Sequence, residues 1–208
     1  MGSAPVNEED PIRRVVVGIC GSSGVIYGIR LLETCASIPS VETHLVMTPA
    51  ARQTITLETD WRPVDVERLA DVSYRYTDIS AAISSGSYPV DAMAVVPCSM
   101  RTLAAIAHSF DDNLLSRAAD VTLKERRRLV LVPRESPLHL GHLRSMVQAT
   151  EMGAILCPPN PAFYSRPENL DDVVNHTVAR IMDLIGIQPP AAMIRRWSGP
   201  ARTSESQR

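Results

Sequence analysis

Aromatic residues, long apolar runs and an excess of charge of either sign are all scarce in this sequence. Only 4% of its 208 residues are aromatic, and the formal net charge is -2. The few aromatics argue against a base-stacking platform, and the charge gives no global basic surface for nucleic acid. No apolar run approaches the roughly 20 residues that a membrane-spanning helix needs. We therefore expect a protein that binds neither nucleic acid nor membranes.

The cysteines form no pattern of a metal site or a disulfide framework. Cys20, Cys35, Cys98 and Cys157 show no CxxC spacing and no companion histidine cluster. The segment HLGH at 139–142 also differs from the zinc motif HExxH. This usage is typical of reduced thiols in a cytosolic protein, and the polar start MGSAPVNEEDPIRR lacks the apolar core of a signal peptide. We expect a cytoplasmic protein without a metal ion.

Length and composition favour one globular domain. The chain is long enough to bury a substantial core, and 45% of its residues are hydrophobic. Its start is polar and acidic, and its end is polar. We expect a single domain over residues 12–197, with disordered tails at 1–11 and 198–208.

Short apolar runs alternate with helical patterns along the chain. Five runs are expected to be strands: Arg14–Ile19, Glu42–Met47, Asp91–Val96, Leu129–Val132 and Ala154–Cys157. Continuous apolar runs indicate strands buried on both faces, and their alternation with helices predicts right-handed crossovers. The fold class is therefore α/β, a three-layer doubly wound parallel sheet of the flavodoxin-like or Rossmann-like kind. Residues 60–90 show no regular pattern, and we expect them to be irregular.

A turn of glycine and serine follows the first expected strand and precedes a helix. Gly21, Ser22, Ser23 and Gly24 would direct backbone N–H groups and a helix dipole at an anion above the turn. The spacing is neither GxGxxG nor the P-loop motif, which disfavours a dinucleotide and a nucleoside triphosphate. A plain strand-to-helix turn remains the alternative.

Hydroxyl groups and one Arg–Glu pair follow the other strands. Thr48, Ser99, Thr102, Arg134 and Glu135 each stand just after a strand, where open α/β sheets bind their ligands. Thr48 also fits a helix N-cap, and the Arg–Glu pair could be an ordinary surface pair. The set suits a mononucleotide that carries one phosphate, and FMN is the first candidate.

Four longer motifs resemble the UbiX-type flavin prenyltransferases. They are the GSSG turn, PCSMRTLAAIAHS, the block DNLLSRAADVTLKERRRLVLVPRESPLH and NPAFYSRP, and the resemblance covers nearly all of residues 13–197. It implies a metal-independent enzyme that transfers a dimethylallyl group from dimethylallyl phosphate to N5 and C6 of reduced FMN. The product, prenylated FMN, would serve a UbiD-type decarboxylase. Family members are flavodoxin-like homo-oligomers, commonly dodecamers.

The resemblance also implies roles for individual residues. FMN would contact Gly21, Ser22, Ser23, Thr48, Ser99, Met100, Arg101, Thr102 and Arg134. The donor phosphate would meet Arg117, Lys124, Tyr164 and Arg180, some of them across a subunit interface. The catalytic group would comprise Ser23 and Glu58 near the reacting edge of the flavin, Lys124, the acid Glu135 and the aromatic lid Trp197. Before the resemblance, Arg117 and Lys124 are also compatible with a solvated pair on one helix face.

These residue types suit the loss of phosphate from an allylic ester. Three cations and a phenol can stabilise a leaving phosphate without a metal, and Glu135 with the bound phosphate could relay a proton. Two other functions remain open, an FMN-dependent decarboxylase of the peptidyl-cysteine type and a non-catalytic FMN-carrying accessory subunit. The sequence leaves open whether the donor is a mono- or a diphosphate.

Overall fold

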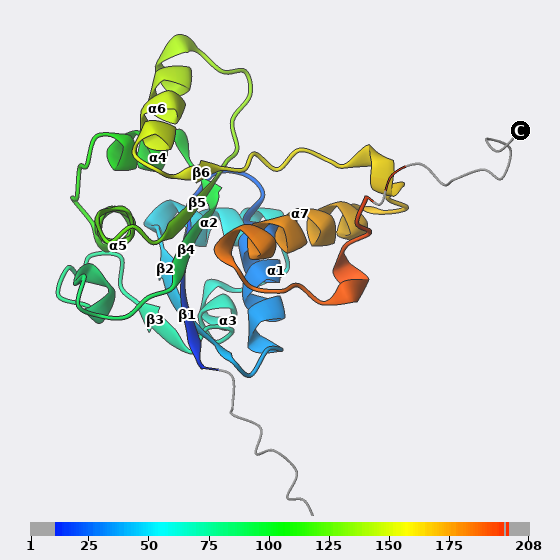
Figure 1. Ribbon diagram of the computed structural model, residues 1–208, viewed down its shortest axis with the longest axis horizontal. Helices are drawn as coiled ribbons and strands as arrows, with labels where there is room; N and C mark the ends of the chain where they lie inside the picture. The colour runs from blue at the N-terminus through cyan, green and yellow to red at the C-terminus, as the bar shows by residue number, and fades with distance from the viewer. Residues whose placement is uncertain (1–10, 198, 200–208) are drawn as a thin grey trace, which may run out of the picture.

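The computed structural model describes residues 11–197 and residue 199, and it contains one parallel sheet (Figure 1). The order across the sheet is β3-β2-β1-β4-β5-β6. The strands are β1 (Arg13–Ile19), β2 (Val41–Met47), β3 (Val72–Tyr74), β4 (Ala92–Cys98), β5 (Arg128–Pro133) and β6 (Ile155–Leu156). Every paired neighbour in this sheet runs parallel, which confirms the doubly wound α/β fold. Of the tails expected at 1–11 and 198–208, residues 1–10, 198 and 200–208 lie outside the described residues.

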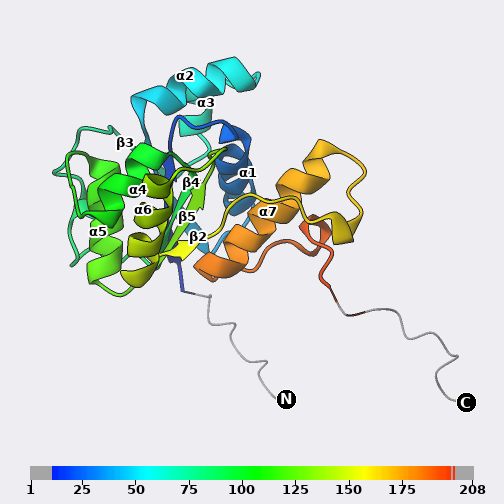
Figure 2. The same ribbon diagram turned by 90° about the horizontal axis from the view of Figure 1, so that it is seen from above.

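Two hydrophobic cores cover the two faces of the sheet. Along β1, Val15 and Val17 belong to one core while Val16 belongs to the other, since side chains alternate across a strand. The first core packs against α1 (Val25–Ala36) and α7 (Leu170–Ile185), and the second packs against α4 (Met100–Ala107) and α5 (Leu114–Lys124). The helix α6 (Leu140–Glu151) lies against α4, and the sheet separates α4, α5 and α6 from α1 and α7 (Figure 2).

The expectation of five strands and an irregular segment at 60–90 is wrong in part. This segment contains α3 (Pro63–Glu67), the edge strand β3 and the short 3-10 helix η1 (Ala82–Ser84). Asp71, just before β3, accepts hydrogen bonds from the backbone N–H and the hydroxyl of Thr43 on β2, at 2.7 and 2.9 Å. A strand of three residues is too short to show a period, so its pairing with β2 depends on this tertiary contact.

The chain leaves β1 and β4 toward opposite faces of the sheet. The helix α1 follows β1 on one face, whereas α4 follows β4 on the other, and these two strands are neighbours. A crevice therefore opens between their carboxyl ends, at the topological switch point of the sheet. Within residues 11–197, the helices are all too short or too polar to cross a bilayer.

Candidate functional site

A pocket of about 590 Å³ lies beyond the carboxyl ends of β1, β2 and β4. We call it the strand-end pocket. It is lined by Gly21, Ser22, Thr48, Pro49, Ala50, Gln53, Tyr76, Ser99, Met100, Arg101, Thr102 and Glu135. The crevice that the fold predicts is thus a real cavity, and seven of the nine residues assigned to FMN by resemblance line it.

The N-terminus of α4 faces this pocket with hydroxyls and backbone donors. Ser99 is the N-cap, and its hydroxyl accepts a hydrogen bond of 3.3 Å from the backbone N–H of Thr102. The Ser99 hydroxyl also donates to the Thr102 hydroxyl at 3.2 Å. The first-turn N–H groups of a helix have no partner within the helix, and the helix dipole favours a negative charge there. This end of α4 is therefore suited to an anion.

Two other hydroxyls in the pocket have different roles. Thr48 is the N-cap of α2 (Pro49–Glu58), and its side chain accepts a hydrogen bond of 3.0 Å from Ala51 N–H. The cap that its position indicates is therefore present, and the residue still lines the pocket. The hydroxyl oxygen of Ser22 is buried and has no hydrogen-bond partner among the described residues. Such a group normally finds a partner, and a ligand in the pocket would supply one.

A second pocket, of about 790 Å³, lies on the other side of the first turn. We call it the Glu58 pocket. Its lining includes Ser23, Gly24, Glu58 and Arg134. Residues adjacent in the chain line the two pockets. Ser22 and Glu135 line the strand-end pocket, and their neighbours Ser23 and Arg134 line the Glu58 pocket. A ligand longer than either pocket could therefore extend from one into the other across the turn.

Two buried thiols lie behind the strand-end pocket. The thiol of Cys20 donates to the hydroxyl of Thr102 at 3.2 Å. A hydrogen bond with Cys98 lowers the pKa of Cys20 to about 7, against the effect of burial. The same bond, together with burial, raises the pKa of Cys98. Both side chains are fully buried, so the pair supports the pocket wall from the core.

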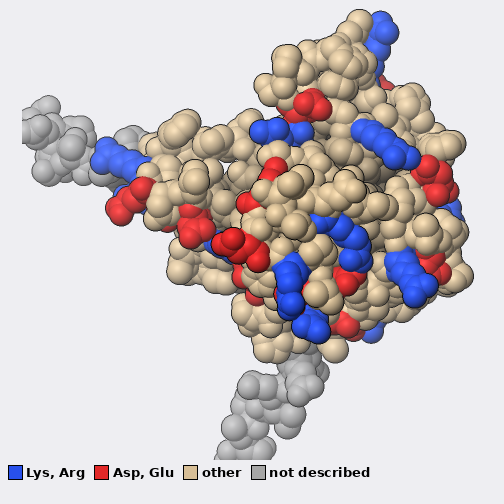
Figure 3. Space-filling view, turned by 180° about the vertical axis from the view of Figure 1, so that it is seen from behind, with Lys and Arg blue, Asp and Glu red and all other residues tan. Residues whose placement is uncertain are grey.

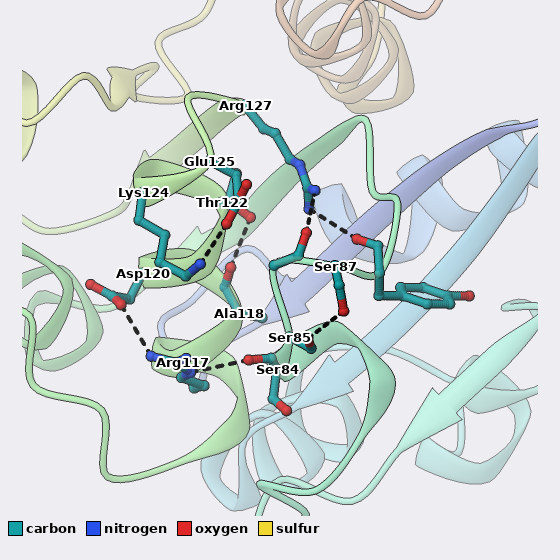
Figure 4. A network of polar contacts seen from close by, with 12 residues as sticks. Ser84, Ser85, Ser87, Arg117, Ala118, Asp120, Thr122, Lys124, Glu125 and Arg127 are labelled. Carbon is teal, nitrogen blue, oxygen red and sulfur yellow. Dashed lines mark hydrogen bonds and ion pairs between the residues drawn. The ribbon is translucent and has the colours of Figure 1, made fainter.

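Arg117 and Lys124 lie away from both pockets, on α5 (Figure 4). The Arg117 guanidinium donates to the carbonyl of Ser84 at 3.2 Å and forms ion pairs with two aspartates, Asp111 and Asp120, at 3.2 and 3.3 Å. Lys124 pairs with its neighbour Glu125. Both cations therefore have acidic partners here, and they lie on the face of the sheet that carries the second core.

Tyr164, Arg180 and Trp197 lie near one another on the opposite face, around α7. The ring centroids of Tyr164 and Trp197 are 6.0 Å apart in an edge-to-face arrangement. Arg180 pairs with Asp183 at 2.8 Å, and Arg196 holds the same carboxylate with two contacts, at 2.9 and 2.8 Å. The hydrogen bonds from Arg196 lower the pKa of Asp183, and the charges of both arginines act in the same direction.

Within one protomer, the four residues that the resemblance assigns to the donor phosphate thus lie in two separate groups. Arg117 and Lys124 project from α5, while Tyr164 and Arg180 lie at α7 on the other face of the sheet. The FMN residues and Glu135 are gathered at the strand ends. All four phosphate residues can meet one ligand only if two subunits contribute to the site.

No sequence pattern identified several residues that lie in or near the site. Gln53 and Tyr76 line the strand-end pocket, Trp61 lines the Glu58 pocket, and His176 contacts Tyr164. Gln53 lies one turn after the start of α2, a position that could have been noticed once Thr48 was assigned as a cap. Tyr76 and Trp61 fall in the segment expected to be irregular, where no pattern ties a residue to the site.

Charge is mixed on the surface, and titratable side chains do not cluster as metal ligands. On the face shown in Figure 3, basic and acidic side chains are interspersed. Over residues 11–197, no group of three or more His, Cys, Asp or Glu residues is placed to hold a metal ion. The polar features of the strand-end pocket are hydroxyls, backbone donors, one amide, one arginine and one carboxylate.

Comparison with known proteins gives consistent matches over most of the chain. A family model described as Flavoprotein matches residues 3–182. The flavin prenyltransferase UbiX of Escherichia coli is 55% identical over 188 residues, which are 90% of this chain and 100% of that protein.

Solved structures agree with the sequence match. The crystal structure of AnUbiX (PadA1) in complex with FMN and dimethylallyl pyrophosphate has a TM-score of 0.87 and 47% identity, covering 90% of this chain and 98% of that one. A dodecameric FMN-dependent Ubix-like decarboxylase from Escherichia coli has a TM-score of 0.87 and 49% identity, covering 89% and 100%. The peptidyl-cysteine decarboxylase EpiD, at 17% identity, a TM-score of 0.55 and coverage of 73% and 83%, shares the fold alone.

Proposed function

Since the chain belongs to the UbiX family of flavin prenyltransferases, we infer that it transfers a dimethylallyl group from a dimethylallyl phosphate ester to reduced FMN. It is a transferase, and FMN is its substrate. The product would be prenylated FMN, the flavin that a UbiD-type decarboxylase uses. A cytoplasmic location would suit that partnership. We propose that residues 12–197 act together as one flavoprotein domain.

The observation that best supports this function is the strand-end pocket with its polar lining. Hydroxyls of Ser22, Ser99 and Thr102 and the N-terminus of α4 together offer donors to one phosphate and a ribityl chain. The unpartnered Ser22 hydroxyl fits a ligand that carries oxygen atoms. We propose that these residues, with Gly21, Thr48, Met100 and Arg101, hold FMN, and that Ser23 and Arg134 contact it from the Glu58 pocket.

The donor phosphate would be bound where two subunits meet. Arg117 and Lys124 of one subunit and Tyr164 and Arg180 of the next would supply three cations and a phenol. Charge-assisted hydrogen bonds from such groups stabilise a leaving phosphate most strongly in a site closed to water. We propose a homo-oligomer, in keeping with the dodecameric relative, in which this arrangement completes each site.

Reduced FMN supplies the nucleophile when it is bound, and acids and an aromatic ring of this chain assist the transfer. Glu135, at the rim of the strand-end pocket, would move the proton that closure of the second bond releases. Glu58 and Ser23 lie in the adjoining pocket, where they would face the reacting edge of the flavin. Trp197, with 66% of its surface exposed, would cover the allyl group and stabilise positive charge on it.

The direct test is anaerobic incubation of the protein with reduced FMN and dimethylallyl monophosphate, followed by mass spectrometry of the released flavin. The expected product carries one additional C5 prenyl unit, and a parallel reaction with the diphosphate identifies the donor. Recovery of bound but unmodified FMN with both donors would contradict prenyl transfer. A decarboxylase of the peptidyl-cysteine type or an FMN carrier would then be the better explanation.

A further inference from the structure

A buried histidine contacts the phenol that is assigned to the donor phosphate. His176, on α7, is 7% exposed, and its Nε2 lies 3.0 Å from the hydroxyl oxygen of Tyr164. The two rings meet edge to face, with centroids 5.6 Å apart. The Tyr164 ring also meets Trp197 edge to face. The phenol therefore contacts both a buried residue of α7 and a residue of the C-terminal segment.

We propose that His176 is a positioning residue for phosphate binding: its Nε2–H donates to the Tyr164 oxygen, so that the phenol O–H is left to donate to the phosphate. The proposal rests on the function inferred above and extends it to a residue outside both pockets. It follows from the number of protons available. A phosphate dianion offers only acceptors, and a phenol has one proton to donate. If Tyr164 gave that proton to His176, it could not bind the phosphate.

The surroundings of His176 determine how many protons it carries. Burial lowers its pKa, and the positive charge of Arg180, four residues later on the same helix face, lowers it further. A neutral imidazole has a single N–H, so its tautomer decides the direction of the bond to Tyr164. With the proton on Nε2, the histidine donates and the tyrosine keeps its own proton for the ligand.

The position of His176 relative to the other phosphate residues supports this role. Arg180 belongs to the same helical face, so α7 carries both the cation and the residue that orients the phenol. Tyr164 itself comes from the short 3-10 helix η2 (Phe163–Ser165), and its side chain is 52% exposed. An exposed tyrosine on a short element needs a fixed partner to keep one direction, and the buried histidine provides it.

The test compares the variants His176→Leu, His176→Gln and His176→Asn with the variant Tyr164→Phe. A Leu side chain cannot donate a hydrogen bond, a Gln amide places an N–H near the position of Nε2, and an Asn amide is too short to reach Tyr164. Two quantities are measured, the steady-state constants for dimethylallyl phosphate and the Kd of inorganic phosphate for the FMN-loaded protein, by calorimetry. The control His108→Leu removes an exposed histidine at the end of α4.

We expect His176→Leu to raise the KM for the donor and the phosphate Kd by about tenfold, with kcat changed far less. His176→Gln should stay within about threefold of the unchanged protein, and Tyr164→Phe combined with His176→Leu should match Tyr164→Phe alone. An equal loss from His176→Leu with and without the Tyr164 hydroxyl, or no loss at all, would overturn the proposal.

If His176→Leu does not fold, as shown by loss of FMN binding, the Asn and Gln variants decide the matter. Both keep a polar side chain in the same place, so they differ mainly in reach. Rescue by Gln and loss with Asn supports the hydrogen bond, whereas equal behaviour of the two variants contradicts it. Failure of the function itself is a separate result, because then the unchanged protein would return FMN without a prenyl group.

Discussion

The backbone N–H of Gly24 donates a hydrogen bond of 2.8 Å to the Glu58 carboxylate. This contact joins the start of α1 to the last residue of α2. The helices that follow β1 and β2 are thereby linked through the Glu58 carboxylate. Gly24 has a φ of 98°, a left-handed conformation that favours glycine and directs its N–H at the carboxylate. Glu58 is therefore already oriented in its pocket by the first turn.

We expect Glu58→Gln to slow prenyl transfer on the order of 10²-fold while FMN still binds. The amide oxygen can still accept from Gly24, so the turn keeps its geometry and only the charge is lost. Stopped-flow or mass-spectrometric rates with saturating donor measure the effect, and Glu151→Gln, at the exposed end of α6, is the control. An unchanged rate would remove Glu58 from the chemical step.

Glu135→Gln should slow turnover by at least about 10²-fold without weakening FMN binding, because a carboxylate at the pocket rim would move a proton that an amide cannot. Flavin fluorescence measures FMN affinity, and mass spectrometry of the released flavin measures product. Normal product formation by this variant would exclude Glu135 from the mechanism.

Mixing two impaired variants should raise activity if each site takes residues from two subunits. We expect Lys124→Ala and Tyr164→Phe each to be clearly less active than the unchanged protein at a donor concentration below its KM. When they are co-expressed in equal amounts, about a quarter of the sites should have both residues intact. Activity of the purified mixed oligomer is the readout. A mixture no more active than its components would show that one subunit supplies both residues.

Gly28→Ala should destabilise the fold by about 1–3 kcal/mol, the usual cost of overpacking, partly offset by better helix propensity. A Cβ at Gly28 on α1 would clash with the backbone carbonyl oxygen of Val96, which cannot move aside easily. Gly18→Ala is the comparison, because its Cβ would meet side chains alone, the nearest being the flexible Leu115 side chain at 3.1 Å. Urea unfolding measures both, and a smaller loss for Gly28→Ala than for Gly18→Ala would contradict this reasoning.

Asp183→Asn should lower stability by about 1 kcal/mol at pH 7 and by less in acid. The arginines keep the pKa of Asp183 below its value in the unfolded chain, so the ionised carboxylate stabilises the folded state above that unfolded value. The contribution disappears as the pH falls through the folded pKa. Urea unfolding at pH 7 and at the lowest pH at which the protein stays folded tests this, and a difference independent of pH would contradict it.

The sequence by itself determined the sheet class and the position of the strand-end pocket. Apolar runs such as Arg14–Ile19 and Leu129–Val132 predict buried parallel strands, because burial on both faces leaves a continuous hydrophobic signal. The Gly/Ser turn after β1 and the Ser99 cap are local as well, since a turn or a cap depends on residues adjacent in the chain. The motifs that resemble known flavin prenyltransferases indicated the function.

Tertiary structure alone decided which distant side chains meet. It placed Tyr76 in the pocket, paired the short strand β3 with β2, and set His176 against the Tyr164 hydroxyl. It also put Lys124 and Arg180 on opposite faces of the sheet, so that one subunit cannot complete the proposed phosphate site. Such contacts depend on how helices pack across a sheet, and no spacing along the chain encodes that packing.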